Sequence, residues 1–236
     1  MFLIACGDDD TITLDKPTIN FHFKHLYKTN NIDIRTDNSL VYTNEAGNPW
    51  NIKSIKYYIS KLIIYKDDSI AYDVNMVKLI NPAESNTEYQ EYILKDIPAG
   101  RYTKMSFIFG VDSTRNKFLG LGNTSEANSM EWPDPLGGGY HFMMMEGVYQ
   151  NNNNVLSGYA IHLGKNNNQY YAEYPIDFTA KDGAKANINI IMNVDQWFDG
   201  INTIDLNDGY GYMMDDDAKQ LLFKQNASSV FSIEQL

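Results

Sequence analysis

The sequence predicts an all-β protein: an antiparallel β-sandwich, immunoglobulin-like or jelly-roll-like, with at most short helices. Apolar and polar residues alternate with a period of two in many segments, and these segments are rich in aromatic and β-branched residues. Clusters of Asn, Asp, Gly and Pro bound the segments, as turns between strands require. Strands at this spacing, with no long helical pattern between them, favour a sandwich.

The individual strands follow from this alternation along the chain. In Thr18-Ile19-Asn20-Phe21-His22-Phe23, for example, every second residue is apolar. The expected strands are residues 18–23, 52–65, 72–80, 92–94, 102–109, 140–145, 159–163, 170–178 and 186–194. The alternation stops near residue 195, and we expect one short helix at residues 213–222 before a last strand at 230–231.

Length, composition and charge limit the classes of protein that this chain can belong to. It has 236 residues, of which 43% are hydrophobic and 13% aromatic, enough for a sizeable core. The net charge of -11 opposes binding to phosphate backbones, because such binding relies on Lys and Arg releasing counterions. We therefore expect no nucleic-acid partner, and one folded domain at residues 17–236.

The start of the chain resembles the processing site of a bacterial lipoprotein, in which a Cys becomes the lipidated N-terminus. The residues are Leu3-Ile4-Ala5-Cys6-Gly7, and Cys6 is the single Cys of the chain, so it cannot form an internal disulfide. The acidic run Gly7-Asp8-Asp9-Asp10 resembles the signal that sends some lipoproteins to the outer face of the outer membrane. We expect residues 1–16 to be a signal remnant, the lipidated Cys6 and an acidic tether. The protein would then be anchored to the outer membrane by lipid alone, at the cell surface or facing the periplasm.

The most distinctive segment, residues 130–147, combines potential ligands for a soft metal ion. It contains Trp132, His141 and four Met beside three adjacent glycines, and His162 follows soon after. Thioether sulfur and imidazole nitrogen are neutral ligands that suit Cu(I), and the glycines let the backbone turn or approach closely. The segment therefore indicates a type of ligand, although Met on strands also commonly fills gaps in a core.

Strand geometry turns these residues into a specific hypothesis. Residues two apart in a strand share a face, so His141, Met143 and Met145 are expected to project together. If the polar run of residues 150–154 is a hairpin loop, His141 lies roughly opposite His162. Directly opposed side chains are about 4.5 to 5.5 Å apart, close enough for two imidazoles to share one metal ion.

The expected site binds copper, as Cu(I), and has three kinds of contributor. His141 and His162 are the expected ligands, with Met143 or Met130 as a thioether ligand. Trp132 is expected to be a neighbour of the metal or a modified ligand.

Several short motifs occur in an order that is characteristic of one protein family. They are Tyr57-Tyr58-Ile59-Ser60, Ile97-Pro98-Ala99-Gly100-Arg101-Tyr102, Phe109-Gly110-Val111-Asp112-Ser113 with Asn116, Met130-x-Trp132 leading to Gly139-Tyr140 and Glu146-Gly147, and His162-Leu163-Gly164. Over nearly the whole mature chain this order resembles the MbnP-like family, named for a periplasmic protein of the methanobactin copper-acquisition system. The resemblance implies a secreted or lipid-anchored β-sandwich, and in some relatives copper is bound through His and a Trp oxidised to kynurenine. Asp134 and Lys117 stand where many relatives have Trp and His.

Three kinds of function remain open at this point. The first is a non-enzymatic surface lipoprotein that captures, buffers or hands over copper, with an outer-membrane transporter or a second lipoprotein as partner. The second is a module for glycans or other small ligands, because 17 Tyr and 3 Trp can offer stacking platforms, which exposed Trp50 or Trp197 would favour. The third is an adhesin or structural subunit. No Walker, His-Glu-x-x-His or Gly-x-Ser-x-Gly motif occurs, and we expect no enzymatic activity.

Overall fold

The structure, a computed structural model, describes residues 16–66, 69–84 and 90–236. The expected lipidation site, Cys6, and nearly all of the expected tether lie outside these described residues. The strands are β1 (Thr18–Tyr27), β2 (Asn30–Asn31), β3 (Tyr42–Thr43), β4 (Pro49–Trp50), β5 (Ser54–Lys66), β6 (Ser69–Asp73), β7 (Val77–Ile80), β8 (Glu91–Leu94), β9 (Gly100–Phe109), β10 (Met143–Gln150), β11 (Leu156–Leu163), β12 (Tyr170–Ala180), β13 (Lys185–Asn193) and β14 (Phe231–Gln235). The helices are α1 (Ser125–Asn128) and α2 (Asp217–Val230), with short 3-10 turns at Asp134–Leu136, Asn166–Asn168, Val194–Trp197 and Leu206–Asp208.

The smaller of the two sheets in the described residues has the order β14-β13-β1-β2, and β8 also pairs with β1. Strands β1 and β13 run parallel, from Thr18 opposite Lys185 to Leu26 opposite Asn193, whereas the other strand pairs of both sheets are antiparallel. A period of two identifies a strand but not the direction of its partner, so the sequence did not reveal the parallel pair. The predicted all-β sandwich is confirmed.

The larger sheet has the order β12-β9-β5-β10-β4-β3, to which β11 adds beside β10, and β6 and β7 beside β5. The two sheets pack through aromatic side chains. Phe231 of β14 meets Phe107 and Phe109 of β9 at ring-centre distances of 5.5 Å each, and Trp197 packs on Phe109 at 5.2 Å. These four rings are buried, and large aromatic side chains bury much apolar area in a core.

Several expected elements have different bounds in the structure, among them the strand expected at residues 140–145, which is β10 at Met143–Gln150. Two further differences have a clear local cause. The expected strand at residues 72–80 is divided between β6 and β7, because Asn75 has a φ of 48°, a left-handed conformation that interrupts a strand. The expected helix at residues 213–222 instead begins at Asp217 and continues to Val230. It starts there because the Asp216 carboxylate accepts a hydrogen bond from the Lys219 backbone N–H and so caps the helix.

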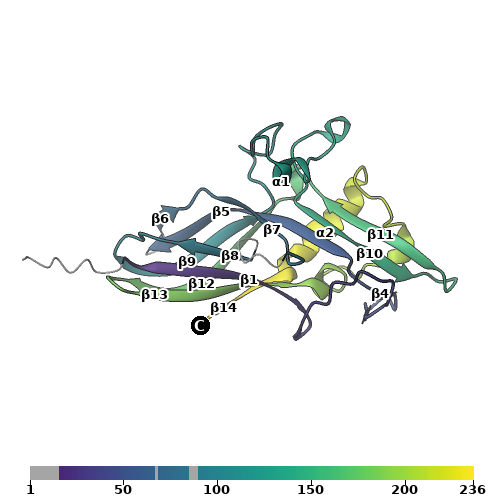
Figure 1. The fold of residues 1–236 in the computed structure, drawn as a ribbon, viewed down its shortest axis with the longest axis horizontal. Coiled ribbons are helices and arrows are strands. Elements are labelled where there is room, and N and C mark those ends of the chain that lie inside the picture. The colour runs from purple at the N-terminus through teal and green to yellow at the C-terminus, as the bar shows by residue number, and fades with distance from the viewer. Residues whose placement is uncertain (1–15, 67–68, 85–89) are drawn as a thin grey trace, which may run out of the picture.

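The hairpin of β10 and β11 extends toward one end of the molecule, with α2 next to it (Figure 1). The loops that contain α1 protrude on the side of the larger sheet (Figure 1). No helix in the described ranges has the length and apolar character needed to cross a bilayer.

Candidate metal centre

The structure brings His141 and His162 into contact. Their ring centres are 5.0 Å apart and the ring planes are nearly perpendicular, at 89°. His162 lies on β11, whereas His141 comes just before β10 begins at Met143. The predicted proximity of the two imidazoles is therefore present in the fold.

The strand register that was expected to create this contact is wrong. Strand β10 extends through Gln150, which pairs with Leu156, so the turn lies one residue further along the chain than expected. In the observed register Met144 lies opposite His162, three residues from the expected partner His141. Because His141 lies outside the ladder, its ring reaches His162 through the local path of the backbone and not through cross-strand pairing.

His141 is buried and has one ring nitrogen fixed and the other free of partners. Its backbone N–H and its Nδ1 both donate to the Met130 carbonyl, at 2.7 and 3.2 Å. Burial, assisted by the nearby His162, lowers the pKa of His141 to about 4, so the ring is neutral at neutral pH. Its Nε2 is buried and has no hydrogen-bond partner among the described residues. A neutral imidazole held by one nitrogen, with the other lone pair available, is the usual state of a histidine metal ligand.

His162 has a carboxylate partner that the sequence did not indicate. Its Nε2 donates to Glu146 Oε1 at 2.8 Å, and Glu146 lies two residues beyond Met144 on the same face of β10. In the neutral ring this bond leaves the Nδ1 lone pair of His162 available. A carboxylate behind a histidine fixes the orientation of the ring and raises its basicity as a ligand.

Trp132 packs directly on His141. Its ring centre is 4.9 Å from that of His141, and its indole N–H donates to the Leu136 carbonyl at 3.2 Å. The other neighbour of the indole is Gly164, two residues after His162, where a Cβ atom would lie 2.4 Å from Trp132 Cε3. The predicted neighbourhood of Trp132, His141 and His162 is thus assembled from three separate segments.

The methionines are distributed differently from the expectation. Met143 and Met145 are completely buried and face the core with Leu163 and Ile161 as cross-strand partners, on the face opposite to His162. Met130 is also buried, and it contacts His141 through its backbone carbonyl. The partly buried Met144 lies directly across from His162 and is the thioether that shares its face. The error in register is the reason that the sequence pointed to Met143.

Within the described ranges, no three side chains of His, Cys, Asp or Glu cluster closely enough to hold a metal ion by themselves. The pair of imidazoles would therefore need a thioether, an oxidised Trp132 or an incoming molecule as a further donor. The residues fit copper in chemical type, because imidazole and thioether are both neutral ligands that suit it.

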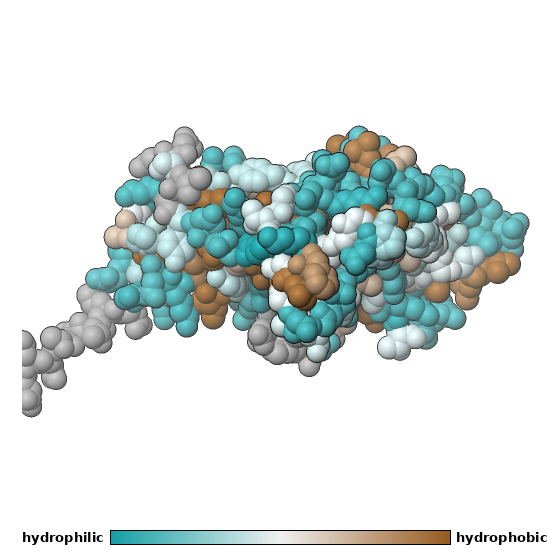
Figure 2. Space-filling view, turned by 90° about the horizontal axis from the view of Figure 1, so that it is seen from above, coloured by the Kyte–Doolittle hydropathy of each residue, from teal (hydrophilic) through white to brown (hydrophobic). Residues whose placement is uncertain are grey.

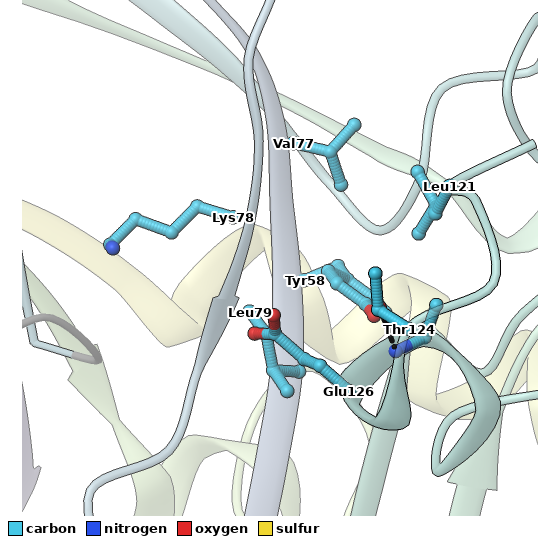
Figure 3. Close-up of a pocket in the computed structure, with 8 residues that line it drawn as sticks. Tyr58, Val77, Lys78, Leu79, Leu121, Thr124 and Glu126 are labelled. Atoms are coloured by element: carbon cyan, nitrogen blue, oxygen red, sulfur yellow. Dashed lines mark hydrogen bonds between the residues drawn. The ribbon is translucent and has the colours of Figure 1, made fainter.

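Two surface hollows lie near the centre. One, of about 240 Å³, is lined by Phe118, Leu119, Trp132 and Tyr140 among others, and Phe118 is 71% exposed. The other, of about 270 Å³, lies between β7 and α1, where Figure 3 shows the Lys78 side chain pointing away from Tyr58 and Thr124. The Tyr58 ring at this second hollow packs against the Tyr140 ring, with the ring centres 6.4 Å apart. Figure 2 shows that apolar residues on the face seen from above form separate patches between polar ones.

The tryptophans do not form the sugar-stacking platform that the glycan hypothesis required. Trp50 and Trp197 are both 0% exposed, and Trp132 is 2% exposed. Trp50 packs between Tyr42 and Phe198 in the core, at ring-centre distances of 4.9 and 4.3 Å. These indoles contribute to packing and cannot stack on a sugar in this conformation.

The fold and this centre define an all-β protein with a two-histidine candidate metal site next to a buried tryptophan. The family model MbnP matches residues 16–215, and the chain therefore belongs to the MbnP family. Among solved structures, MbnP from Methylosinus trichosporium is similar in fold, with a TM-score of 0.53 and 11% sequence identity over 92% of this chain and 98% of that chain. No curated protein matches this chain. The family resemblance predicted from the motifs is confirmed.

Proposed function

We propose that this protein is a non-enzymatic lipoprotein that binds copper, as Cu(I), for capture, buffering or handover. The observation that carries the proposal is the buried Nε2 of His141, which has no hydrogen-bond partner in the described residues and belongs to a ring 5.0 Å from that of His162. A buried polar nitrogen without a partner is costly unless a ligand satisfies it. Membership of the MbnP family supports a role in copper handling.

In this proposal His141 binds the metal through Nε2 and His162 through Nδ1. Each histidine is fixed through its other ring nitrogen, by the Met130 carbonyl and the Glu146 carboxylate. Met144 supplies a thioether in place of the expected Met143 or Met130, because it shares the face of His162. Trp132 covers His141 as a neighbour or, when oxidised, as a further donor.

Attachment to the membrane is the second part of the proposal. Lipidation at Cys6 would anchor the domain to the outer membrane, at the cell surface or facing the periplasm. At this location the domain would exchange copper with an outer-membrane transporter or another lipoprotein. The anchor is tested by labelling cells with a radioactive fatty acid and recovering the protein, with Cys6→Ser as the unlabelled control.

Copper binding is tested by anaerobic competition against a chromophoric Cu(I) chelator. The full chain with Cys6→Ser is used, so that no thiol competes with the proposed ligands. We expect one Cu(I) per chain, with affinity reduced more than about a hundredfold by His141→Ala or His162→Ala. His22→Ala is the matched control, because His22 lies on the other sheet and is paired with Glu91. An unchanged affinity in both site variants, or no binding by the parent chain, would contradict the proposal.

A further inference from the structure

Gln220 is a completely buried polar side chain in the first turn of α2. Its Oε1 accepts hydrogen bonds from the backbone N–H of Gly164 at 3.3 Å and from Asn168 Nδ2 at 3.0 Å. Its Nε2 donates to the His162 carbonyl at 3.2 Å. A buried amide with this many partners specifies one local arrangement, because leaving any of them unsatisfied is costly.

These contacts make the Gln220 amide a substitute for a neighbouring strand. The backbone of Leu163 bonds to the adjacent segment through its carbonyl, which accepts from the Phe142 N–H at 2.6 Å. The His162 carbonyl and the Gly164 N–H point the other way, toward the outer edge of β11, where the Ala160 N–H donates to the Tyr210 carbonyl at 2.8 Å. The two edge groups, a carbonyl and an N–H, are both bonded by the one side chain of Gln220.

The same end of α2 is attached to the segment that follows Gly164 by further contacts. Lys165 forms an ion pair of 2.6 Å with Asp217, and Lys224 Nζ donates to the Asn167 carbonyl at 2.6 Å. Asn168 Nδ2 also donates to the Gly164 carbonyl, at 2.8 Å. The helix therefore holds the segment after β11 by several contacts, and among these residues Gln220 is completely buried and Asn168 is nearly so.

The two residues that Gln220 fixes are the ones on which the candidate metal centre depends. The backbone of His162 sets where its ring meets His141, and Gly164 is the surface on which the Trp132 indole rests. We propose that Gln220 is a positioning residue for copper binding, which holds His162 and, through Gly164, Trp132 in place without touching the metal. This inference rests on the proposed function. The family match ends at residue 215, and Gln220 lies outside the matched residues.

The helix offers a matched control in Asn226, a second fully buried amide. Its Nδ2 donates to the carbonyls of Trp197 and Asn202, at 3.0 and 2.9 Å, and its Oδ1 accepts from the Asn202 N–H. Gln220→Leu and Asn226→Leu thus each remove a buried amide from α2, but only the first removes contacts to the end of β11. Both are made in the full chain with Cys6→Ser.

The first measurement is Cu(I) affinity by chelator competition, together with the melting temperature. We expect Gln220→Leu to weaken Cu(I) binding about tenfold. Both variants should lower the melting temperature by similar amounts. The copper affinity of Asn226→Leu should nevertheless stay within about twofold of the parent. Equal copper affinities for the two variants would overturn the inference.

The second measurement needs no copper and separates this inference from the proposed function. The ¹⁵N shifts of the His162 imidazole in the metal-free protein report its orientation and its bond to Glu146. We expect these shifts to move in Gln220→Leu and to be unchanged in Asn226→Leu. If the parent chain binds no copper, the proposed function fails, and unmoved His162 shifts would in addition reject a positioning role for Gln220.

A conservative variant decides the outcome if Gln220→Leu does not fold. Gln220→Glu keeps the length of the side chain and an oxygen that can accept from the Gly164 N–H, but it cannot donate to the His162 carbonyl while ionised. We expect it to weaken Cu(I) binding in the same direction. A copper affinity equal to that of the parent would show that the bond to His162 has no positioning effect.

Discussion

The Trp132 indole packs so closely on Gly164 that no side chain fits between them. A Cβ atom at Gly164 would lie 2.4 Å from Trp132 Cε3 and 2.7 Å from Cδ2. The indole is in turn in contact with His141, at a ring-centre distance of 4.9 Å. A glycine in the motif His162-Leu163-Gly164 is therefore part of the candidate centre because of what its missing side chain allows.

Gly164→Ala is predicted to displace Trp132. The extra methyl group must force the indole or β11 to move, and such overpacking costs about 1–3 kcal/mol of stability. Urea unfolding measures this cost, and Trp fluorescence reports the movement. Gly158→Ala in β11, the strand that ends just before Gly164, is the control, because the nearest atom to its Cβ is 4.0 Å away and no loss is expected there. Equal free energies of unfolding for the two variants would mean that the contact between Trp132 and Gly164 accommodates a methyl group without loss of stability.

Met144→Leu and Met143→Leu are predicted to differ in copper affinity although they are neighbours. Leu replaces Met with nearly equal volume, so both variants should lose less than about 1.5 kcal/mol of stability. Only Met144 shares the face of His162, and only its substitution should weaken Cu(I) binding, about tenfold. Chelator competition on the two variants measures the difference. Weaker Cu(I) binding in Met143→Leu alone would instead identify Met143 as the thioether ligand, as the sequence predicted.

Glu146→Gln is predicted to weaken copper binding about tenfold, because the amide is a poorer acceptor for His162 Nε2–H than the carboxylate. The same competition assay measures this change. Tighter binding would instead show that the metal takes Nε2 and that Glu146 competes with it. Glu91→Gln, which alters the exposed partner of His22 on the other sheet, is the matched control.

The stability of the protein is predicted to fall as the pH decreases below 6.5. Burial lowers the pKa of His25 from 6.5 to about 3, and the Tyr57 hydroxyl donates to its Nε2 at 2.9 Å. Between these two values the unfolded chain binds a proton that the folded chain does not, so the stabilising contribution is complete above pH 6.5 and is lost toward pH 3.

Between pH 7 and pH 5 this linkage predicts a loss of about 2 kcal/mol in the free energy of unfolding from His25. Urea unfolding at pH 7, 6 and 5 measures it. His25→Gln, which keeps an acceptor for Tyr57, should show a smaller slope. A slope equal to that of the parent would exclude His25 as its source, and His141, whose pKa is also lowered, would then be the next residue to substitute.

The sequence predicted most of the individual strands but not their exact limits or all of their partners. The alternation in residues 18–23 was sufficient to identify β1, because its inner face is buried and its outer face is polar. The division of residues 72–80 depended on one left-handed residue, Asn75, which leaves no periodic signal. The parallel pairing of β1 with β13 joins segments that are far apart in the chain, and local patterns contain no information about it.

The candidate centre was predicted in composition and only partly in arrangement. His141, His162 and Trp132 are together, as the motifs indicated, but the ladder places Met144 beside His162 where Met143 was expected. The observed partner of His162, Met144, is three residues from the expected partner His141. Because side chains alternate between the two faces of a strand, a shift by an odd number of residues moves every side chain to the other face. Glu146 belonged to a family motif, but its bond to His162 depends on this register and had no signal in the sequence. Gln220 had no signal, because its role depends on how α2 packs.

The sequence by itself determined the fold class, the family and the chemical types gathered at the centre, because periodicity and motif order are properties of the chain. Only the tertiary structure decided that His141 keeps an unpartnered Nε2, that Glu146 fixes His162 and that Gln220 bonds the edge of β11. These relationships join residues on different elements. Their geometry is set by strand register and packing, which arise only when the whole core is assembled.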